Sequence, residues 1–487
     1  MIRYRELPPG VLNINLIQLF STVGFAVLMG LLNFYLKDHS PLSGAQINTL
    51  TASFFALNFL LHFLGGALGG RFLSFRALFF ISLCFQIVGL FGIASGTYWA
   101  ILAGMAAFVT GSGLNVSCIN MMLTQLFAAQ DRHRRIAFSL NYSFMNIGFL
   151  MSFVVSGYLQ QHNLYDAAFY FATICLLMAI ALHFRAWRFV ADKSTYFALH
   201  FAKSNFRFIV APLSIIACFL GALYLVHHAT FASYLIYVVF LMVLAYMLYF
   251  ASFQSPQYRR QVFAFLLFTS ASMVFACVQG LQATALLHFT QNNTTMSLLG
   301  LTIAPATVNA FETLGVVVFG ALLALAIQRH IHQKKPYSSG YLITKGLSLY
   351  VIAFLAIPVG IYLTGGPMYQ TSVLVPIILL LIVAAGEVHV NSVNYALVGE
   401  LIEPRHQGLF TGYLFVNIAV GVNLAGPISN TMMPTNVAQL SLLQSNLSFI
   451  RVFLVMACVA LIIAIIFGVL AYRINQHLKP EQQMIAK

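Results

Sequence analysis

Residues 379–399 read LLLIVAAGEVHVNSVNYALVG. This stretch is mostly apolar and long enough to cross the hydrocarbon core of a bilayer as a helix, which takes about 20 residues. Glu387 nevertheless lies in its middle, followed by His389, Asn391 and Asn394. A charged side chain at the centre of a membrane helix costs about 2.5–3.5 kcal/mol on insertion scales. We therefore expect a membrane helix whose acid faces something other than lipid.

The composition of the whole chain is that of a membrane protein. Of its 487 residues, 60% are hydrophobic and 7% are charged, whereas a soluble domain carries about 25% charged residues. The six cysteines lie in apolar runs without paired spacing, and the chain contains no phosphate-binding loop. We predict an all-α polytopic membrane protein with no metal, no cofactor and no ATP drive of its own.

Fourteen stretches are apolar and long enough to be transmembrane helices. They cover residues 11–36, 46–70, 76–96, 99–128, 135–160, 166–190, 208–226, 230–253, 260–289, 305–328, 341–365, 371–398, 408–432 and 448–474.

The basic residues are distributed very unevenly between the two sides of these spans. When the N-terminus is placed inside, only Lys37 and Arg451 of the 24 Lys and Arg residues fall outside. Cytoplasmic loops carry the excess of basic residues in membrane proteins. We therefore place both termini in the cytoplasm and the chain in the plasma membrane, most simply a bacterial inner membrane. The formal net charge of +14 is a topology signal, and we expect no nucleic-acid partner.

The order of the spans predicts two bundles. Residues 1–190 form a first six-helix bundle, residues 260–476 a second one, and residues 477–487 a cytoplasmic tail. The segment 191–259 contains a basic linker and two inserted spans with almost no polar side chains at depth, which we expect to face lipid as a hairpin. The stretch 185–207 has the composition of an interfacial amphipathic helix. A six-two-six plan is typical of transporters built from repeats.

Two carboxylates, Glu312 and Glu387, lie deep in the spans, and no Lys or Arg lies equally deep. Glu387, Asn391 and Asn394 share one helix face because they are spaced i, i+4 and i+7. The same spacing argument pairs Asn309 with Glu312, Gln279 with Gln282, Asn15 with Gln18, and Tyr142 with Asn146.

These polar stripes have two interpretations. Hydrogen bonds between membrane helices are common and contribute about 0.6 kcal/mol on average, so a lone Asn or Gln is often structural. Two acids without a deep basic partner instead favour a shared aqueous cavity. His389 lies on the other side of its helix from Glu387, and we expect it, like His62, to be structural.

Three segments resemble one family, the proton-dependent oligopeptide transporters of the major facilitator superfamily. They are GGALGGRFLSFR (65–76), FSLNYSFMNIG (138–148) and GEVHVNSVNYALVGELIEPRHQGLFTGYLFVNIAVGVNLAG (386–426). The resemblance implies a major-facilitator fold of two six-helix bundles, with the two extra helices that bacterial members carry. It also implies secondary transport of peptides by symport with protons.

The chain departs from the family pattern at positions that carry charge in the family. In the first helix, the family motif Glu-x-x-Glu-Arg is replaced by Asn15, Gln18 and Leu19. Val116 stands where the family has a Lys in the fourth helix, and Gln279 where it has a Glu in the seventh. Gly70 stands where the family has an Asp in the loop after the second helix. Charged partners tend to disappear together, because a buried charge left alone is costly. Glu387 remains, at the position that receives the amino terminus of a peptide in the family.

We therefore expect a secondary transporter that moves a small organic solute by alternating access, with substrate at mid-membrane between the bundles. Glu387 would hold an amine group, and the other polar stripes would supply neutral hydrogen bonds. Di- and tripeptides are the expectation from the family, followed by other amine-bearing molecules. Proton coupling is expected to be atypical or absent, with Glu387 and Glu312 as its candidate carriers.

The sequence also allows two other classes of function. One is a non-transporting sensor on a transporter scaffold, because the coupling residues of the family are missing. The other is an intramembrane enzyme that uses His389 and Asn391.

The distribution of basic residues generates a topology prediction. Tags at residues 1, 197 and 487 should be cytoplasmic, and a tag near residue 292 should be external, because loops rich in Lys and Arg stay on the cytoplasmic side of the membrane. Labelling of introduced cysteines with an impermeant reagent measures this. External labelling at residue 197 would contradict the two-bundle plan.

Overall fold

The computed structural model has the fourteen membrane spans that the sequence predicts. Among the residues it describes, 14 helical segments are long and apolar enough to cross a membrane, which confirms the all-α membrane class. The described residues are 7–127, 131, 133–193, 195–199, 207–332, 339–403, 406–433 and 441–477.

The chain divides into two compact units, residues 1–42 with 53–232 and residues 43–52 with 233–487. The inserted pair of helices is therefore shared, one helix in each unit. The domain limits that we draw from the sequence remain a prediction.

The first unit is organised around its first helix, which packs against the third to sixth helices. Its helices are α1 (Val11–His39), α2 (Gly44–Leu68), α3 (Phe75–Ala94), α4 (Tyr98–Thr124), α5 (His133–Gln161), α6 (Tyr165–Ala186), α7 (Tyr196–Leu199) and α8 (Arg207–His227). Helices α3 and α4 approach each other closely, since a Cβ on Gly104 would lie 2.6 Å from the carbonyl oxygen of Gly89. Small residues allow such backbone contact between membrane helices.

The connection between α2 and α3 is held by the segment that follows α6. Gly70 has φ +70°, and its carbonyl accepts a hydrogen bond from the backbone N–H of Phe197 at 2.7 Å. The Asp192 carboxylate accepts hydrogen bonds from the N–H of Phe75 at 3.1 Å and from Thr195 at 2.9 Å. Burial raises the pKa of Asp192, against the effect of these hydrogen bonds and of nearby Arg76. Asp192 therefore ties the segment after α6 to the first turn of α3.

These contacts replace the interfacial helix predicted over residues 185–207. In the described part of that stretch, α6 ends at Ala186 and only the one-turn helix α7 follows; residues 200–206 lie outside the described residues. Arg76 donates to the carbonyl of Trp187 at 2.9 Å, and its guanidinium lies 4.7 Å from the centre of the Trp187 ring. For the described residues 187–193 and 195–199 the prediction was wrong, because only α7 is helical there and the segment binds the start of α3.

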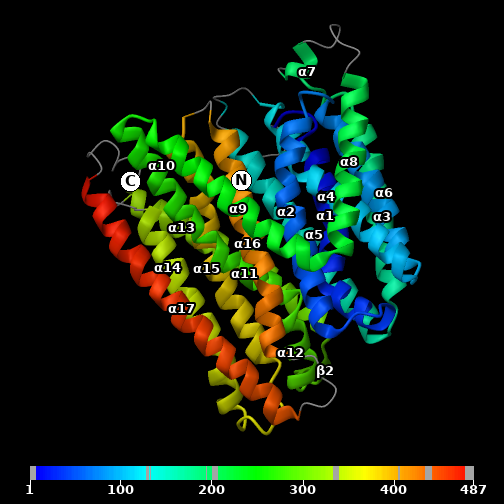
Figure 1. Cartoon of the computed structure of the whole chain (residues 1–487), viewed down its shortest axis with the longest axis vertical. Helices are drawn as coiled ribbons and strands as arrows, with labels where there is room; N and C mark the ends of the chain where they lie inside the picture. The colour runs from blue at the N-terminus through cyan, green and yellow to red at the C-terminus, as the bar shows by residue number, and fades with distance from the viewer. Residues whose placement is uncertain are drawn as a thin grey trace. The chain divides into compact units, whose positions relative to one another are not determined.

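The second unit contains the remaining helices and one small hairpin. Its helices are α9 (Ala229–Ser252), α10 (Pro256–Ser270), α11 (Ser272–Gln282), α12 (Ala285–Asn293), α13 (Pro305–His332), α14 (Ser339–Leu363), α15 (Leu374–Leu401), α16 (Gln407–Met432) and α17 (Leu442–His477). In Figure 1, α14 and α17 run side by side, and α15 lies next to α14. Helix α15 packs against α10, α11, α13, α14 and α16, so its middle is interior.

Asn430 on α16 explains why the first turns of α2 belong to this unit. Its side chain accepts a hydrogen bond from Asn48 at 3.1 Å and donates one to Thr49 at 3.2 Å.

The predicted single span over residues 260–289 is instead broken. Helix α10 ends at Ser270, and α11 and α12 are separated at residues 283–284. At the second break, the hydroxyl of Ser429 on α16 lies 2.8 Å from the Thr284 hydroxyl and accepts from the N–H of Ala285 at 3.3 Å. A backbone break inside a membrane protein needs such a partner. Hydropathy does not detect it, since the partner lies far away in the sequence.

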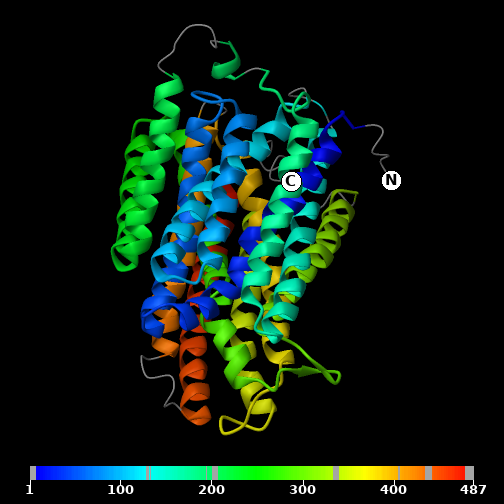
Figure 2. The ribbon, with the colours of Figure 1, turned by 90° about the vertical axis from the view of Figure 1, so that its right-hand side faces the viewer.

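A two-stranded hairpin, which the sequence did not predict, follows α12. Strand β1 (Ser297–Leu298) pairs antiparallel with β2 (Leu301–Thr302). Leu299 and Gly300 both have positive φ, as a two-residue hairpin turn requires. Figure 2 shows the hairpin extending away from the helix ends next to it.

The two inserted helices each cover their own unit. Helix α8 packs on α4, and Asn423 on α16 donates to the Ser233 hydroxyl on α9 at 2.9 Å. Their other faces expose large apolar side chains, among them Leu213, Leu220 and Leu241. These faces are typical of contact with lipid, as the sequence predicts.

Candidate functional site

The two deep acids of the sequence lie close together in the second unit. Glu387 projects from α15 and Glu312 from α13, and the two helices pack against each other. Both side chains are buried, with exposed fractions of 8% and 7%, and the Glu312 carboxyl is close to that of Glu387. The sequence predicts each acid separately; the structure makes them a pair.

Neutral amides surround this carboxyl pair. Asn391 donates to Glu387 Oε1 at 3.2 Å, which confirms that they share a helix face. Asn309 donates to the backbone carbonyl of Gln282 at 3.5 Å. The Gln282 amide is near the Glu312 carboxyl, but at a geometry too poor for a hydrogen bond.

Several buried polar atoms in this region have no hydrogen-bond partner within the described part of the chain. They are both amide atoms of Gln282, Glu312 Oε1, the Tyr350 hydroxyl and both amide atoms of Asn394. Leaving a buried polar group unsatisfied costs about 1–3 kcal/mol. Such a concentration of unmet hydrogen-bonding capacity is expected where a polar ligand or water binds.

Tyr350 on α14 completes the cluster. Its side chain is fully buried, and its hydroxyl experiences the charges of Glu387 and Glu312. The ring reaches this position because Gly386 has no side chain: a Cβ there would lie 2.7 Å from the Tyr350 ring and 3.1 Å from the carbonyl of Gly346. Gly386 therefore positions Tyr350 beside the acid that follows it.

The remaining predicted residues of this unit lie on the same helices. Asn394 is buried on α15, seven residues (about two helical turns) after Glu387. Gln279 is half-buried on α11. The predicted residues of this unit therefore come from α15 and from the two helices α11 and α13 that each pack against it. They are Gln279, Gln282, Asn309, Glu312, Glu387, Asn391 and Asn394.

The predicted residues of the first unit are mostly satisfied within it. Asn15 accepts from Asn141 at 3.2 Å between α1 and α5. Gln18 donates to Thr22 on its own helix at 3.2 Å, and Asn146 donates to the Tyr142 carbonyl at 2.8 Å. The Tyr142 side chain is 44% exposed. Asn15, Gln18 and Asn146 are buried, so hydrogen bonding inside the unit accounts for much of their polarity.

The two histidines considered structural have structural contacts. His62 Nδ1 is 2.9 Å from the carbonyl of Gly113 on α4, and His389 Nδ1 is 2.7 Å from the carbonyl of Ala385. A carbonyl only accepts, so in both rings Nδ1 carries the proton. His389 also packs against Gly346 on α14.

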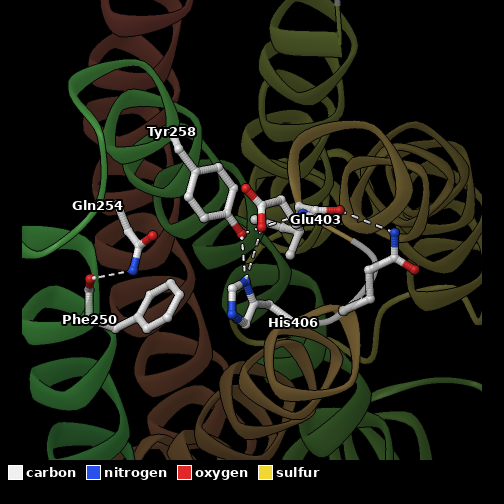
Figure 3. A network of polar contacts seen from close by, with 7 residues as sticks. Phe250, Gln254, Tyr258, Glu403 and His406 are labelled. Carbon is white, nitrogen blue, oxygen red and sulfur yellow. Dashed lines mark hydrogen bonds and ion pairs between the residues drawn. The ribbon is translucent and has the colours of Figure 1, made fainter.

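A second polar cluster joins α10 to the link between α15 and α16, and Figure 3 shows it. The Tyr258 hydroxyl lies 3.2 Å from His406 Nδ1 and accepts from the N–H of Glu403 at 3.4 Å. His406 is 3.9 Å from the Glu403 carboxylate and packs against the Phe250 ring. These groups satisfy one another at a helix end, and we interpret the cluster as a structural joint.

Comparison with known proteins identifies the family. The model of the POT family matches residues 75–442, which is most of the chain. The chain belongs to the POT family. It is a secondary transporter of the major-facilitator fold and an integral membrane protein, not an enzyme, and the sensor and enzyme alternatives have no support.

Relatives with assigned names cover nearly the same length. The dipeptide and tripeptide permease A of Erwinia pyrifoliae is 27% identical over 428 residues, covering 86% of this chain and 85% of the permease. The protein of the same name from Escherichia coli (strain K12) is 26% identical over 467 residues, covering 94% and 91%.

Solved structures share the fold. A peptide transporter POT in complex with sulfate has a TM-score of 0.82 at 17% identity, covering 98% of this chain and 97% of that one. A POT family transporter in complex with 5-aminolevulinic acid has a TM-score of 0.81 at 16% identity. The match covers 96% of this chain and 97% of that transporter.

Sequence reasoning missed two residues of these networks. Tyr350 is one of several tyrosines in apolar spans, and only its packing against Gly386 distinguishes it. Asn141 precedes Tyr142 and contacts Asn15, but it lies off the helix face on which Tyr142 and Asn146 were grouped.

The packing at Gly386 generates a prediction. Gly386→Ala should lower the free energy of unfolding of this POT protein by about 1–3 kcal/mol, the usual cost of overpacking. Gly320→Ala is the matched control on α13, because its Cβ would meet only Val388 at 3.9 Å. Thermal unfolding of the purified proteins measures both. Equal melting temperatures for the two variants would contradict the close contact.

Proposed function

We propose that this chain carries small peptides and related amine-bearing solutes across a bacterial inner membrane, with both termini in the cytoplasm. Glu387 receives the positively charged amine of the solute. The names of the permeases similar to this chain support the peptide class. The solved relative with 5-aminolevulinic acid, which carries an amine, supports the wider class.

The buried carboxyl pair is the observation that carries this proposal. In the described residues, Glu312 makes no salt bridge. Lys345 on α14 is next to Gly346, which lies against Gly386, but its side chain is exposed and its charge acts on His389, on the other side of α15 from Glu387. A buried negative charge without a counter-charge is strongly unfavourable. A cationic solute would supply that counter-charge, and the unsatisfied amides and hydroxyl nearby would supply hydrogen bonds.

The neutral residues of the first unit fit the same class of solute. Asn15 and Gln18 replace charged residues of the family pattern, and both make hydrogen bonds within their unit. The first unit, taken by itself, therefore offers amides and no basic side chain at these positions. We infer that the amine contributes most of the electrostatic attraction.

We assign proton coupling, as symport, to the same carboxyl pair, because the first-helix acids of the family are absent. Uptake by the wild type should depend only weakly on an imposed pH gradient. Glu312→Gln or Glu387→Gln should abolish this weak dependence. Uptake into proteoliposomes with and without the gradient measures this. A strong gradient dependence that survives in both variants would place the proton site elsewhere.

Glu387→Gln tests the amine contact itself. This change keeps shape and removes charge, so it should weaken binding of alanyl-alanine by about 1.5–3 kcal/mol, the range for a charged hydrogen bond. N-acetyl-alanyl-alanine should bind weakly to the wild type and lose little more in the variant, because its amine is already neutral. Ligand-induced thermal shifts of purified protein give the affinities.

The matched control is Glu400→Gln, the same change at an exposed position near the end of α15. It should leave binding of both peptides unchanged. If Glu387→Gln unfolds most of the protein while the folded remainder binds alanyl-alanine normally, Glu387 is a structural residue and the proposal fails.

A further inference from the structure

We infer that the Glu312–Glu387 pair is a single site for two positive charges, and that this transporter takes solutes with two ammonium groups as well as one. This inference rests on the proposed function and names a substrate class within it. Peptides that begin with a basic residue and small diamines belong to this class.

The geometry of the pair is the first argument. Two carboxylates close together in a low-dielectric interior repel each other, so the empty site is most stable with one shared proton. The pair can therefore be neutralised by one ammonium group together with the proton. Two ammonium groups neutralise it equally well, with the shared proton released to solvent.

Unused hydrogen-bonding capacity around Glu312 is the second argument. Glu312 Oε1, both amide atoms of Gln282 and the Tyr350 hydroxyl are buried without a hydrogen-bond partner among the described residues. Asn391 already donates to Glu387 Oε1, whereas Glu312 has a free carboxyl oxygen. An ammonium group has three N–H donors. An ammonium group at Glu312 can therefore also donate to the side-chain amide oxygen of Gln282 and to the Tyr350 hydroxyl oxygen.

The other titratable groups of the surrounding helices do not supply a second positive charge. Tyr350 of α14 faces both acids, but a tyrosine is neutral or negative. Cys277 of α11 is near Tyr237, and Tyr413 of α16 is near Asn417. His389 bonds the Ala385 carbonyl, and it is His389 that Lys345 approaches. For a solute with one ammonium group the second positive charge is therefore the shared proton, and for a solute with two ammonium groups both charges come from the solute.

Two peptides of equal length separate one charge from two. Lysyl-alanine has two ammonium groups, and Nε-acetyl-lysyl-alanine keeps only the one at its amino terminus. The wild type should bind lysyl-alanine about tenfold more tightly, as expected for one added charged hydrogen bond. Titration in weak buffer with a pH dye should show release of about one proton per lysyl-alanine bound and almost none for the acetylated peptide.

Glu312→Gln should remove both effects, because it removes one of the two charges. The affinity ratio should fall to near one and proton release should disappear, while Glu400→Gln on α15 should behave like the wild type. If Glu312→Gln does not fold, the proton titration of the wild type decides alone: no release with lysyl-alanine overturns the inference.

Different binding results overturn the two-charge site and the proposed function. Equal affinity of the wild type for the two peptides, or a preference for lysyl-alanine that persists in Glu312→Gln, overturns the two-charge site and leaves the proposed function standing. Absence of binding by both peptides overturns the proposed function and this inference with it.

Discussion

The cost of holding a carboxylate inside a membrane is the constraint on which this structure depends. Glu387 lies in the middle of α15, where lipid cannot solvate it. The fold keeps the acid away from lipid by surrounding α15 with five other helices of its unit. It also places Glu312 beside it, so each acid has a group of like charge as its neighbour, and under the proposed function a proton or a solute supplies the opposite charge.

The architecture of the second unit follows from this position. Gly386 and Gly346 bring α14 and α15 into contact, and Tyr350 fills the space that they leave. The break between α11 and α12 is satisfied by Ser429 on α16. Membrane proteins tolerate such irregular backbone where it is buried in protein. The break directly follows Gln282, whose amide is near Glu312, so α11 ends beside the carboxyl pair.

The first unit shows the opposite chemistry at its centre. Where the family pattern has charged residues, Asn15 and Gln18 make hydrogen bonds to Asn141 and Thr22. Neutral amides can form such bonds at little desolvation cost compared with a charge. This difference in buried charge between the two units is therefore a property of this chain, and under the proposed function it makes the carboxyl pair the main site of electrostatic recognition.

Hydropathy and helical spacing predict a large part of this molecule. The number of spans and the shared face of Glu387 and Asn391 were predictable, because both depend on local sequence. The break near Thr284, the role of Tyr350 and the closeness of the two acids were not, because each depends on which helices pack together. The interfacial helix after α6 was predicted wrongly, because composition does not show that Asp192 binds the start of α3.

The infrared difference spectrum of the carboxyl groups on binding of an amine-bearing peptide shows whether the acid pair receives the positive charge of the solute. We predict a change in the protonated-carboxyl band of the wild type on saturation with peptide, and loss of that change in both Glu312→Gln and Glu387→Gln. A saturated wild-type protein whose carboxyl bands do not change would contradict the claim that the buried acid pair receives the positive charge of the substrate.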